Sequence, residues 1–196
     1  MAREKRDNNF NIIRFVAAIM VMAGHMAYIG GYTLPTLWGE GIQALGVKIF
    51  FLIGGFLIAK SWESESNPVR YMTKRVFRIF PALIAFTLVA AYVIGPILST
   101  LTINEYFQSP LVRNYLRNIL LFPAYSLPGV FETNPYPNAV NGSLWTLPIE
   151  FAMYILVPII LTLAGKKNEK RYSFAFVSVI TVVLCCLQMV KLLYHP

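Results

Sequence analysis

The chain has 196 residues, of which 57% are hydrophobic and 13% charged, and its formal net charge is +8. Soluble domains carry roughly a quarter charged residues, so this composition excludes an ordinary soluble fold. The 17 lysines and arginines form short clusters between apolar runs rather than one basic face, which argues against a nucleic-acid-binding protein.

Five apolar segments qualify as membrane-spanning helices, given that a hydrocarbon core of ~30 Å needs about 20 helical residues. In chain order they cover approximately residues 10–28, 45–59, 79–98, 147–164 and 174–193. We therefore expect an all-α fold, a polytopic membrane bundle of about five transmembrane helices.

The basic residues predict the orientation of this bundle. Twelve of the 17 precede the first segment or lie in the loops after the second and fourth segments. Because loops rich in Lys and Arg stay in the cytoplasm, the N-terminus and these two loops are predicted to be cytoplasmic. With five spans, the C-terminus then lies on the opposite side.

The loop over residues 99–146 is unusually long and rich in Pro, Asn, Tyr and Gly, and such loops are more often functional than idle. Within it, residues 111–121 show apolar positions at helical spacing, with Arg113 and Arg117 one turn apart. This stretch is too short to span a membrane and is predicted to form a helix at its surface.

Two ionisable residues interrupt the first span. Arg14 and His25 are eleven positions apart, which at about 100° per residue places both on one helical face, ~16 Å apart along the axis. Charged groups inside a membrane are costly and mark functional sites by default. The alternatives are that Arg14 reaches lipid phosphates and His25 packs through a hydrogen bond, or that His25 acts as a general base.

Glu150 opens the fourth predicted span, two residues after Pro148. An acid near a helix start is favoured by the helix dipole, so a purely structural role explains it. The functional alternative is that Glu150 orients His25 or binds a substrate hydroxyl.

Arg75 and Arg78 lie three residues apart before the third span and, with Lys74, form a predicted cationic patch at the cytoplasmic leaflet. The patch either sets topology and binds anionic lipid, or binds a phosphorylated ligand through its guanidinium groups.

Lys48, in the second span, is explained by a side chain that extends to the membrane surface, and Gly54 and Gly55 are expected to allow close helix approach. The adjacent Cys185 and Cys186 point in different directions on a helix and suit neither a mutual disulfide nor a metal site.

Four stretches in this order resemble the membrane-bound acyltransferase family 3, bacterial multi-span proteins that modify cell-surface carbohydrates. They are the Arg14 and His25 pair, the run 46–58, the Arg75-x-x-Arg78 pair followed by residues 79–82, and the stretch 142–151. The chain departs from many relatives at Lys48, where they carry Asp, and at Gly54, where they carry Ser.

The resemblance implies transfer of an acyl group, most often acetyl, from acyl-CoA to a hydroxyl of a cell-surface or exported carbohydrate. The expected partners are acyl-CoA, a carbohydrate acceptor and membrane lipid, with no nucleic acid, no metal and no permanently bound cofactor. The expected location is the cell inner membrane, with several passes.

The same resemblance implies roles for individual residues. His25 would be the general base or a covalent carrier of the acyl group, and Glu150 would hold the imidazole or the sugar. Arg14, Arg75 and Arg78 would bind the phosphates of CoA, and Trp145 would stack on the pyranose ring.

Members of the family usually have about ten spans, so residues 1–196 are expected to be a single domain corresponding to the N-terminal half. The missing half or a second copy is then an expected partner. Two other interpretations remain. The chain could be a transporter or flippase component for a glycan or lipid, because intramembrane Arg, His and Glu would also suit that role. It could also be an inactive fragment. Transporters tend to show internal repeats, and this sequence shows none.

Overall fold

The computed structural model describes residues 10–65 and 67–163, and in these ranges the secondary structure is helical. Four helical stretches are long and apolar enough to cross a membrane: Phe10–Ile29, Ile42–Ser64, Pro68–Leu98 and Gly142–Leu163. They correspond to the first four predicted spans, which confirms the all-α membrane bundle. The predicted fifth span, residues 174–193, lies outside the described residues.

The chain divides into two compact units, with the boundary inside α2 (Ile42–Ser64) between residues 57 and 58. The first unit contains α1 (Phe10–Ile29) and most of α2. The second contains the end of α2, all helices from α3 to α7 and the segments between them. Each unit is described by itself.

In the first unit, α1 and α2 approach closely at small residues. A side chain at Gly46 of α2 would meet the Ala17 carbonyl oxygen and Val21 of α1, and Gly24 is similarly covered by Gln43. Small residues at such crossings let two backbones pack tightly. The expectation for Gly54 is not met in the described part of the chain, because a Cβ there would have no atom of a neighbouring element within 4 Å.

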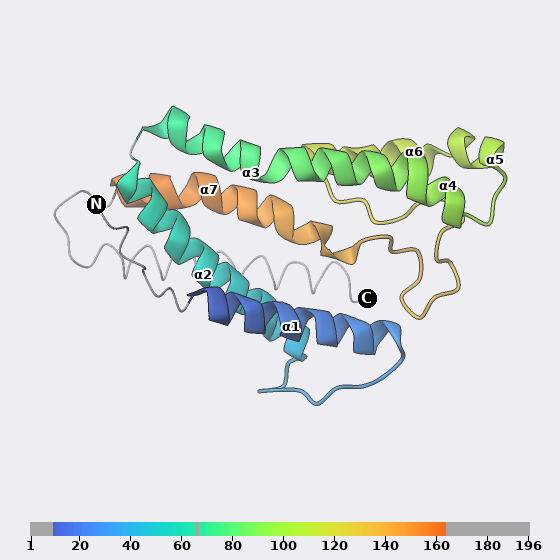
Figure 1. The fold of residues 1–196 in the computed structure, drawn as a ribbon, viewed down its shortest axis with the longest axis horizontal. Helices are drawn as coiled ribbons and strands as arrows, with labels where there is room; N and C mark the ends of the chain where they lie inside the picture. Colours follow the sequence, from blue (N-terminus) through green and yellow to red (C-terminus); the bar gives the residue numbers. More distant parts are fainter. Residues whose placement is uncertain (1–9, 66, 164–196) are drawn as a thin grey trace, which may run out of the picture. The chain divides into compact units, whose positions relative to one another are not determined.

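The longest helical stretch starts earlier than the sequence predicted. α3 (Pro68–Val89) begins eleven residues before the expected position 79, because the Asn67 side chain accepts a hydrogen bond from the Arg70 backbone and Pro68 occupies the first turn. The stretch continues through a π-helical turn, Ala90–Ile94, into α4 (Gly95–Leu98), as Figure 1 shows. At ~1.5 Å per residue, a helix of 31 residues exceeds the ~30 Å hydrocarbon core, so its charged first turns extend beyond the membrane.

The π-helical turn leaves one carbonyl without a backbone partner. The Gly95 N–H donates to the Ala90 carbonyl, and the next donor in this register would be residue 96, which is a proline. The free Ala91 carbonyl instead accepts a bond of 2.8 Å from the Tyr106 hydroxyl. Any side chain at Gly95 would collide with that hydroxyl, which explains the glycine.

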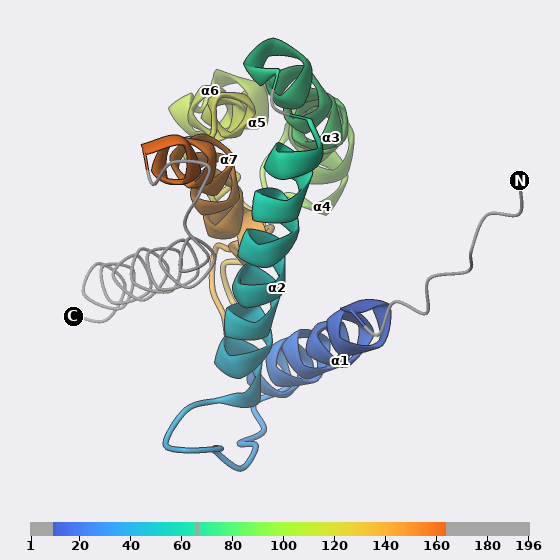
Figure 2. The same ribbon diagram turned by 90° about the vertical axis from the view of Figure 1, so that its left-hand side faces the viewer.

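Tyr106 belongs to a compact region built from the long loop. The loop contains α5 (Ile103–Gln108), α6 (Pro110–Tyr115) and a 3-10 turn, Leu116–Leu120, which lie beside α3 in Figures 1 and 2. The predicted helix at 111–121 is thus confirmed as an α-helix that continues into a 3-10 turn. A cluster of seven buried residues joins this region to the π-helical turn. They are Ala90, Ala91, Tyr106, Val112, Tyr115, Leu127 and Val130. Burial, with Tyr92 nearby, raises the pKa of Tyr106 to about 12, so its hydroxyl stays a donor at neutral pH.

Asn118 holds the segment that returns from this region. Its side chain donates to the Tyr115 and Ala124 carbonyls, each at 2.8 Å, and accepts from the Ala124 backbone N–H at 2.9 Å. Only 2% of Asn118 is exposed, so these three backbone groups have no access to water as an alternative partner.

We expect Asn118→Ala to lower the free energy of unfolding by about 2–4 kcal/mol, because it leaves three buried backbone groups unpaired. Asn114→Ala, one turn earlier on the exposed side, is the matched control and should cost less than about 0.5 kcal/mol. Thermal unfolding of both variants in detergent measures the difference, and equal stabilities would contradict the assignment.

Candidate functional site

The first candidate feature is α1, which presents Arg14 and His25 from one unbroken helix of 20 residues. The expectation that they share a face therefore follows from helix geometry, with an axial separation of ~16 Å. Arg14 is half-buried, and His25 is exposed. Both lie next to the face of α1 that Ala17 and Gly24 pack against α2.

The hydrogen bond of His25 selects the tautomer of its neutral ring. Its Nδ1 lies 2.8 Å from the Val21 carbonyl oxygen, one turn back on the same helix. Because a carbonyl only accepts, the bond requires a proton on Nδ1. In the neutral ring, Nε2 then carries the free lone pair, the form needed for a base or a nucleophile.

The second candidate feature surrounds Arg75 of α3, in the second unit. Its guanidinium donates to the Ser61 hydroxyl at the end of α2. The guanidinium carbon also lies 5.1 Å from the ring centre of Tyr71 and 5.2 Å from that of Tyr154. Cations at this distance from aromatic faces are attracted by the ring quadrupole. Arg75 is thus held by three helices.

Tyr154 connects this cation to Glu150, because its hydroxyl donates to the Glu150 carboxylate one turn earlier on α7 (Thr146–Leu163). Since α7 begins at Thr146, Glu150 is in the second turn, and the helix dipole acts mainly on the first. The structural explanation for this acid is thereby weakened. The structure gives Glu150 a tyrosine partner, and the His25 proton is already fixed by Val21.

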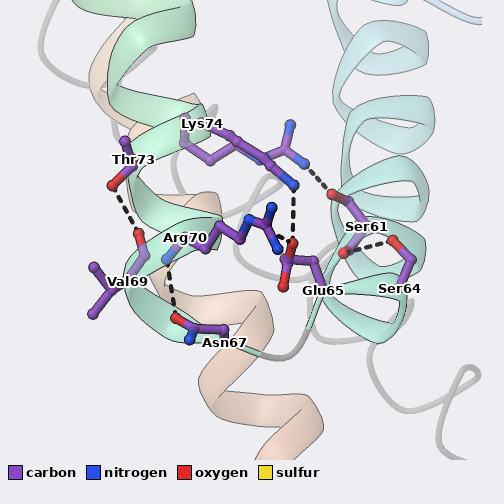
Figure 3. Close-up of polar contacts among 9 residues, drawn as sticks. Ser61, Ser64, Glu65, Asn67, Val69, Arg70, Thr73 and Lys74 are labelled. Carbon is purple, nitrogen blue, oxygen red and sulfur yellow. Dashed lines mark hydrogen bonds and ion pairs between the residues drawn. The ribbon is translucent and has the colours of Figure 1, made fainter.

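The predicted cationic patch is divided between two faces of α3. Lys74 and Arg70 turn toward Glu65 in the connection between α2 and α3, at 3.1 and 3.4 Å, as Figure 3 shows. Arg75 turns instead toward the two tyrosines, and Arg78 is exposed. Successive helical residues point about 100° apart, which separates Lys74 from Arg75.

Three of the cations singled out in the sequence form no ion pair with a carboxylate of the described residues. In the described part of the chain, Glu65 forms ion pairs with Arg70 and Lys74, and Glu40 forms one with Lys48. None of these pairs includes Arg14, Arg75 or Arg78. Guanidinium groups left without an acid are suited to bind an anion such as phosphate.

An apolar groove of about 330 Å³ lies beside Arg75. Tyr71 and Tyr154, the rings that flank the guanidinium, form part of its wall, with Trp62 of α2 and Pro158 of α7. Its surface is almost entirely apolar. A ligand with an anionic head and a thin apolar arm could contact the cation and the groove together.

Trp145, the predicted sugar platform, is half-buried at the end of a 3-10 turn, Gly142–Trp145, that leads into α7. This residue already takes part in an interaction inside the protein. Lys48 also has a partner, since it forms an ion pair with Glu40 from the loop before α2. No group of three His, Cys, Asp or Glu side chains that could hold a metal occurs among the described residues.

The sequence analysis missed Tyr71, Tyr154 and Ser61. The two tyrosines had a signal, because Tyr71 precedes Arg75 by four residues and Tyr154 follows Glu150 by four. That spacing places each pair on one helical face. Ser61 had no such signal, because its contact with Arg75 depends on how α2 and α3 pack.

Comparison with known proteins identifies the family. The family model described as an acyltransferase domain, number 3 in its series, matches residues 7–194. This chain belongs to the acyltransferase family 3. The resemblance seen in the four sequence stretches is thereby confirmed, and with four apolar helices the chain is a multi-pass membrane protein.

Several curated proteins are similar to this acyltransferase-family chain. An O-acetyl transferase of Shigella phage Sf6 is 37% identical over 85% of the chain and 49% of the relative. Nodulation protein 10 of Rhizobium leguminosarum bv. viciae is 32% identical over 79% of the chain and 44% of its own length. A Bacillus subtilis protein named as a candidate peptidoglycan O-acetyltransferase is 26% identical over 84% of the chain and 26% of its own length.

The chain spans about half the length of the first two of these relatives. No solved structure matches it.

The contacts of Tyr154 predict different effects for two substitutions. Tyr154→Phe keeps the ring beside Arg75 and removes the bond to Glu150, whereas Tyr154→Leu removes the face on which the guanidinium lies. We expect labelling of Arg75 by an arginine-specific dicarbonyl reagent to stay near the wild-type rate in Tyr154→Phe and to rise several-fold in Tyr154→Leu.

The exposed Arg113 on α6 serves as the internal control, since its labelling should be the same in all three proteins. Mass spectrometry of the labelled peptides gives both rates. Equal labelling of Arg75 in the two variants would show that the Tyr154 ring does not cover it.

Proposed function

We propose that this chain forms the N-terminal half of an O-acyltransferase of the cell inner membrane. It transfers an acyl group, most often acetyl, from acyl-CoA to a hydroxyl of a cell-surface or exported carbohydrate. The observation that supports the proposal is the bond from Nδ1 of His25 to the Val21 carbonyl, which leaves the lone pair of the neutral ring on Nε2. Family membership and the names of the Shigella phage and Bacillus relatives support the reaction class.

The reaction begins with a hydroxyl of the acceptor next to Nε2 of His25. Nε2 takes the hydroxyl proton while the oxygen attacks the thioester carbonyl carbon, and a tetrahedral intermediate forms. The C–S bond then breaks, and the imidazolium returns the proton to the CoA thiolate. The products are an ester and free CoA, and His25 is neutral again. General base catalysis of this kind contributes about 10²–10⁴-fold.

A covalent route uses the same lone pair. Nε2 would attack the thioester itself, and the acceptor hydroxyl would then displace the histidine from the acyl-imidazole. Both routes need a free lone pair on Nε2, and in the neutral ring the Val21 bond leaves the lone pair on that nitrogen. A burst of CoA release without acceptor would indicate the covalent route.

Acyl-CoA is proposed as the donor because three arginines form no ion pair among the described residues and could bind its phosphates. The phosphates of CoA cannot enter lipid, so they are proposed to stay at the cytoplasmic side with Arg14, Arg75 and Arg78. The groove beside Arg75 supports this assignment, since a pantetheine arm is thin and largely apolar while its nucleotide end is anionic. Glu150 is proposed to accept a hydrogen bond from a sugar hydroxyl through the carboxylate oxygen not taken by Tyr154.

His25→Gln should reduce acetyl transfer by about 10²–10⁴-fold, because an amide can bond to Val21 but cannot accept a proton at neutral pH. The assay follows radioactive acetyl from acetyl-CoA into membrane glycan, with the protein in its native membrane. Met26→Ala removes an exposed side chain from the next position of α1 and is the matched control. Normal transfer by an inserted His25→Gln protein would remove His25 from the mechanism.

Arg78→Glu should raise the KM for acetyl-CoA at least tenfold with a smaller change in kcat, since it reverses an exposed charge proposed to bind phosphate. Lys74→Glu reverses a charge four residues earlier that is already paired with Glu65, and it should leave the KM for the donor near the wild-type value. If both variants lowered only the amount of protein in the membrane, the cationic patch would act in setting the membrane topology. A protein that binds no acyl-CoA would favour a role in transport.

A further inference from the structure

The loop between α1 and α2, drawn in light blue in Figure 1, contains a tight turn with two residues at its tip. Leu37 and Glu40 exchange both backbone hydrogen bonds, at 2.8 and 3.1 Å. Trp38 and Gly39 between them have φ angles of +53° and +77°. Two successive positive φ angles are typical of the type I′ turn, whose first position is usually Asn, Asp or Gly.

A tryptophan in this position is strained. For a residue with a Cβ, the left-handed region costs roughly 1–2 kcal/mol, and bulky side chains there are true outliers. Such strain persists where surrounding contacts fix the backbone, and it clusters at functional sites. Here the fixing contacts are the paired Leu37 and Glu40 and the ion pair from Glu40 to Lys48 of α2.

The strain is not offset by packing of the indole in the described part of the chain, because Trp38 is 93% exposed. The turn thus holds a large aromatic face away from its own unit. Trp38 lies in the loop that follows α1, and His25 lies in the last turns of that helix. In the predicted topology, this end of α1 is the non-cytoplasmic end.

We propose that Trp38 is a binding residue for the carbohydrate acceptor, with the indole stacked on the face of a pyranose ring. This proposal rests on the proposed function and assigns its acceptor side. The C–H groups on a pyranose face carry partial positive charge, and the face of an indole is negative, so the two surfaces attract as well as exclude water. Trp145 is less suited to this role, because it is half-buried and already has an interaction within the protein.

The competing occupant for an exposed tryptophan is the lipid surface, where Trp is enriched. The loop over residues 30–41 contains no Lys or Arg, so anionic headgroups would give such an anchor no electrostatic help. An anchor also gains nothing from a fixed and strained backbone, since an indole in a headgroup layer tolerates many orientations. A sugar ring, in contrast, must meet a face of defined direction.

Trp38→Gly is the main test, because glycine removes the indole and also relieves the strained φ angle. We expect the KM for the acceptor oligosaccharide to rise about three- to tenfold, as for the loss of one aromatic stack. The KM for acetyl-CoA and the thermal stability should be retained, and Trp38→Phe should restore most of the acceptor affinity. Tyr32→Ala, which removes another exposed aromatic from the same loop, is the matched control and should leave the acceptor KM unchanged.

Gly39→Ala separates the effect of the turn geometry from the effect of the Trp38 indole ring. A methyl group at Gly39 meets no described atom within 4 Å, but the positive φ makes it strained, so the turn loosens while Trp38 stays. The acceptor KM should again rise, by less than in Trp38→Gly. An unchanged acceptor KM in Trp38→Gly would overturn the proposal.

A fluorescence experiment distinguishes failure of this proposal from failure of the proposed function. With Trp62 and Trp145 replaced by Phe, Trp38 is the single tryptophan of the chain. A shift of the Trp38 emission to shorter wavelength on adding the oligosaccharide, without quenching by brominated lipid, would support the proposal even in a protein that transfers no acetyl. Quenching by brominated lipid alone would identify a membrane anchor and overturn it.

Discussion

The guanidinium of Arg75 joins three helices, and the arrangement of the second unit depends on it. It donates a hydrogen bond to the Ser61 hydroxyl of α2 and lies against the rings of Tyr71, on its own helix, and Tyr154, on α7. A charge that is partly buried in a protein is costly unless polar or aromatic groups replace water. Among the described residues they are aromatic faces and a hydroxyl rather than a carboxylate, so the helices are held together without neutralising the positive charge.

The long outer loop solves a different problem, that of irregular backbone next to a membrane. Its carbonyl and N–H groups need partners within the protein, since lipid offers none. The Tyr106 hydroxyl supplies one at the π-helical turn, where Pro96 cannot, and the Asn118 side chain supplies three at the return of the chain. Two buried side chains therefore satisfy four backbone groups of a segment that contains no spanning helix and packs around a core of its own.

The sequence predicted those features of the fold and of the candidate site that depend on neighbouring residues along the chain. Hydropathy located the first four spans, and the period of a helix placed Arg14 and His25 on one face. The start of α3 was misplaced by eleven residues, because a hydropathy pattern stops at charged residues whereas the helix starts at its cap, Asn67. The division of Lys74 from Arg75 could have been read from their adjacency. The hydrogen bond to Ser61 and the left-handed Trp38 could not, because packing and turn closure produce them.

The proposed chemistry depends on groups whose geometry is set within single helices or single turns. The Val21 carbonyl fixes the His25 proton from one turn away, and Tyr154 fixes Glu150 at the same spacing. Trp38 is held by a turn of four residues. Pre-organisation of this local kind survives movement of whole helices, because each pair moves as one body. If the proposed function holds, helices that part to admit a donor and an acceptor therefore keep the tautomer of His25 and the orientation of Glu150.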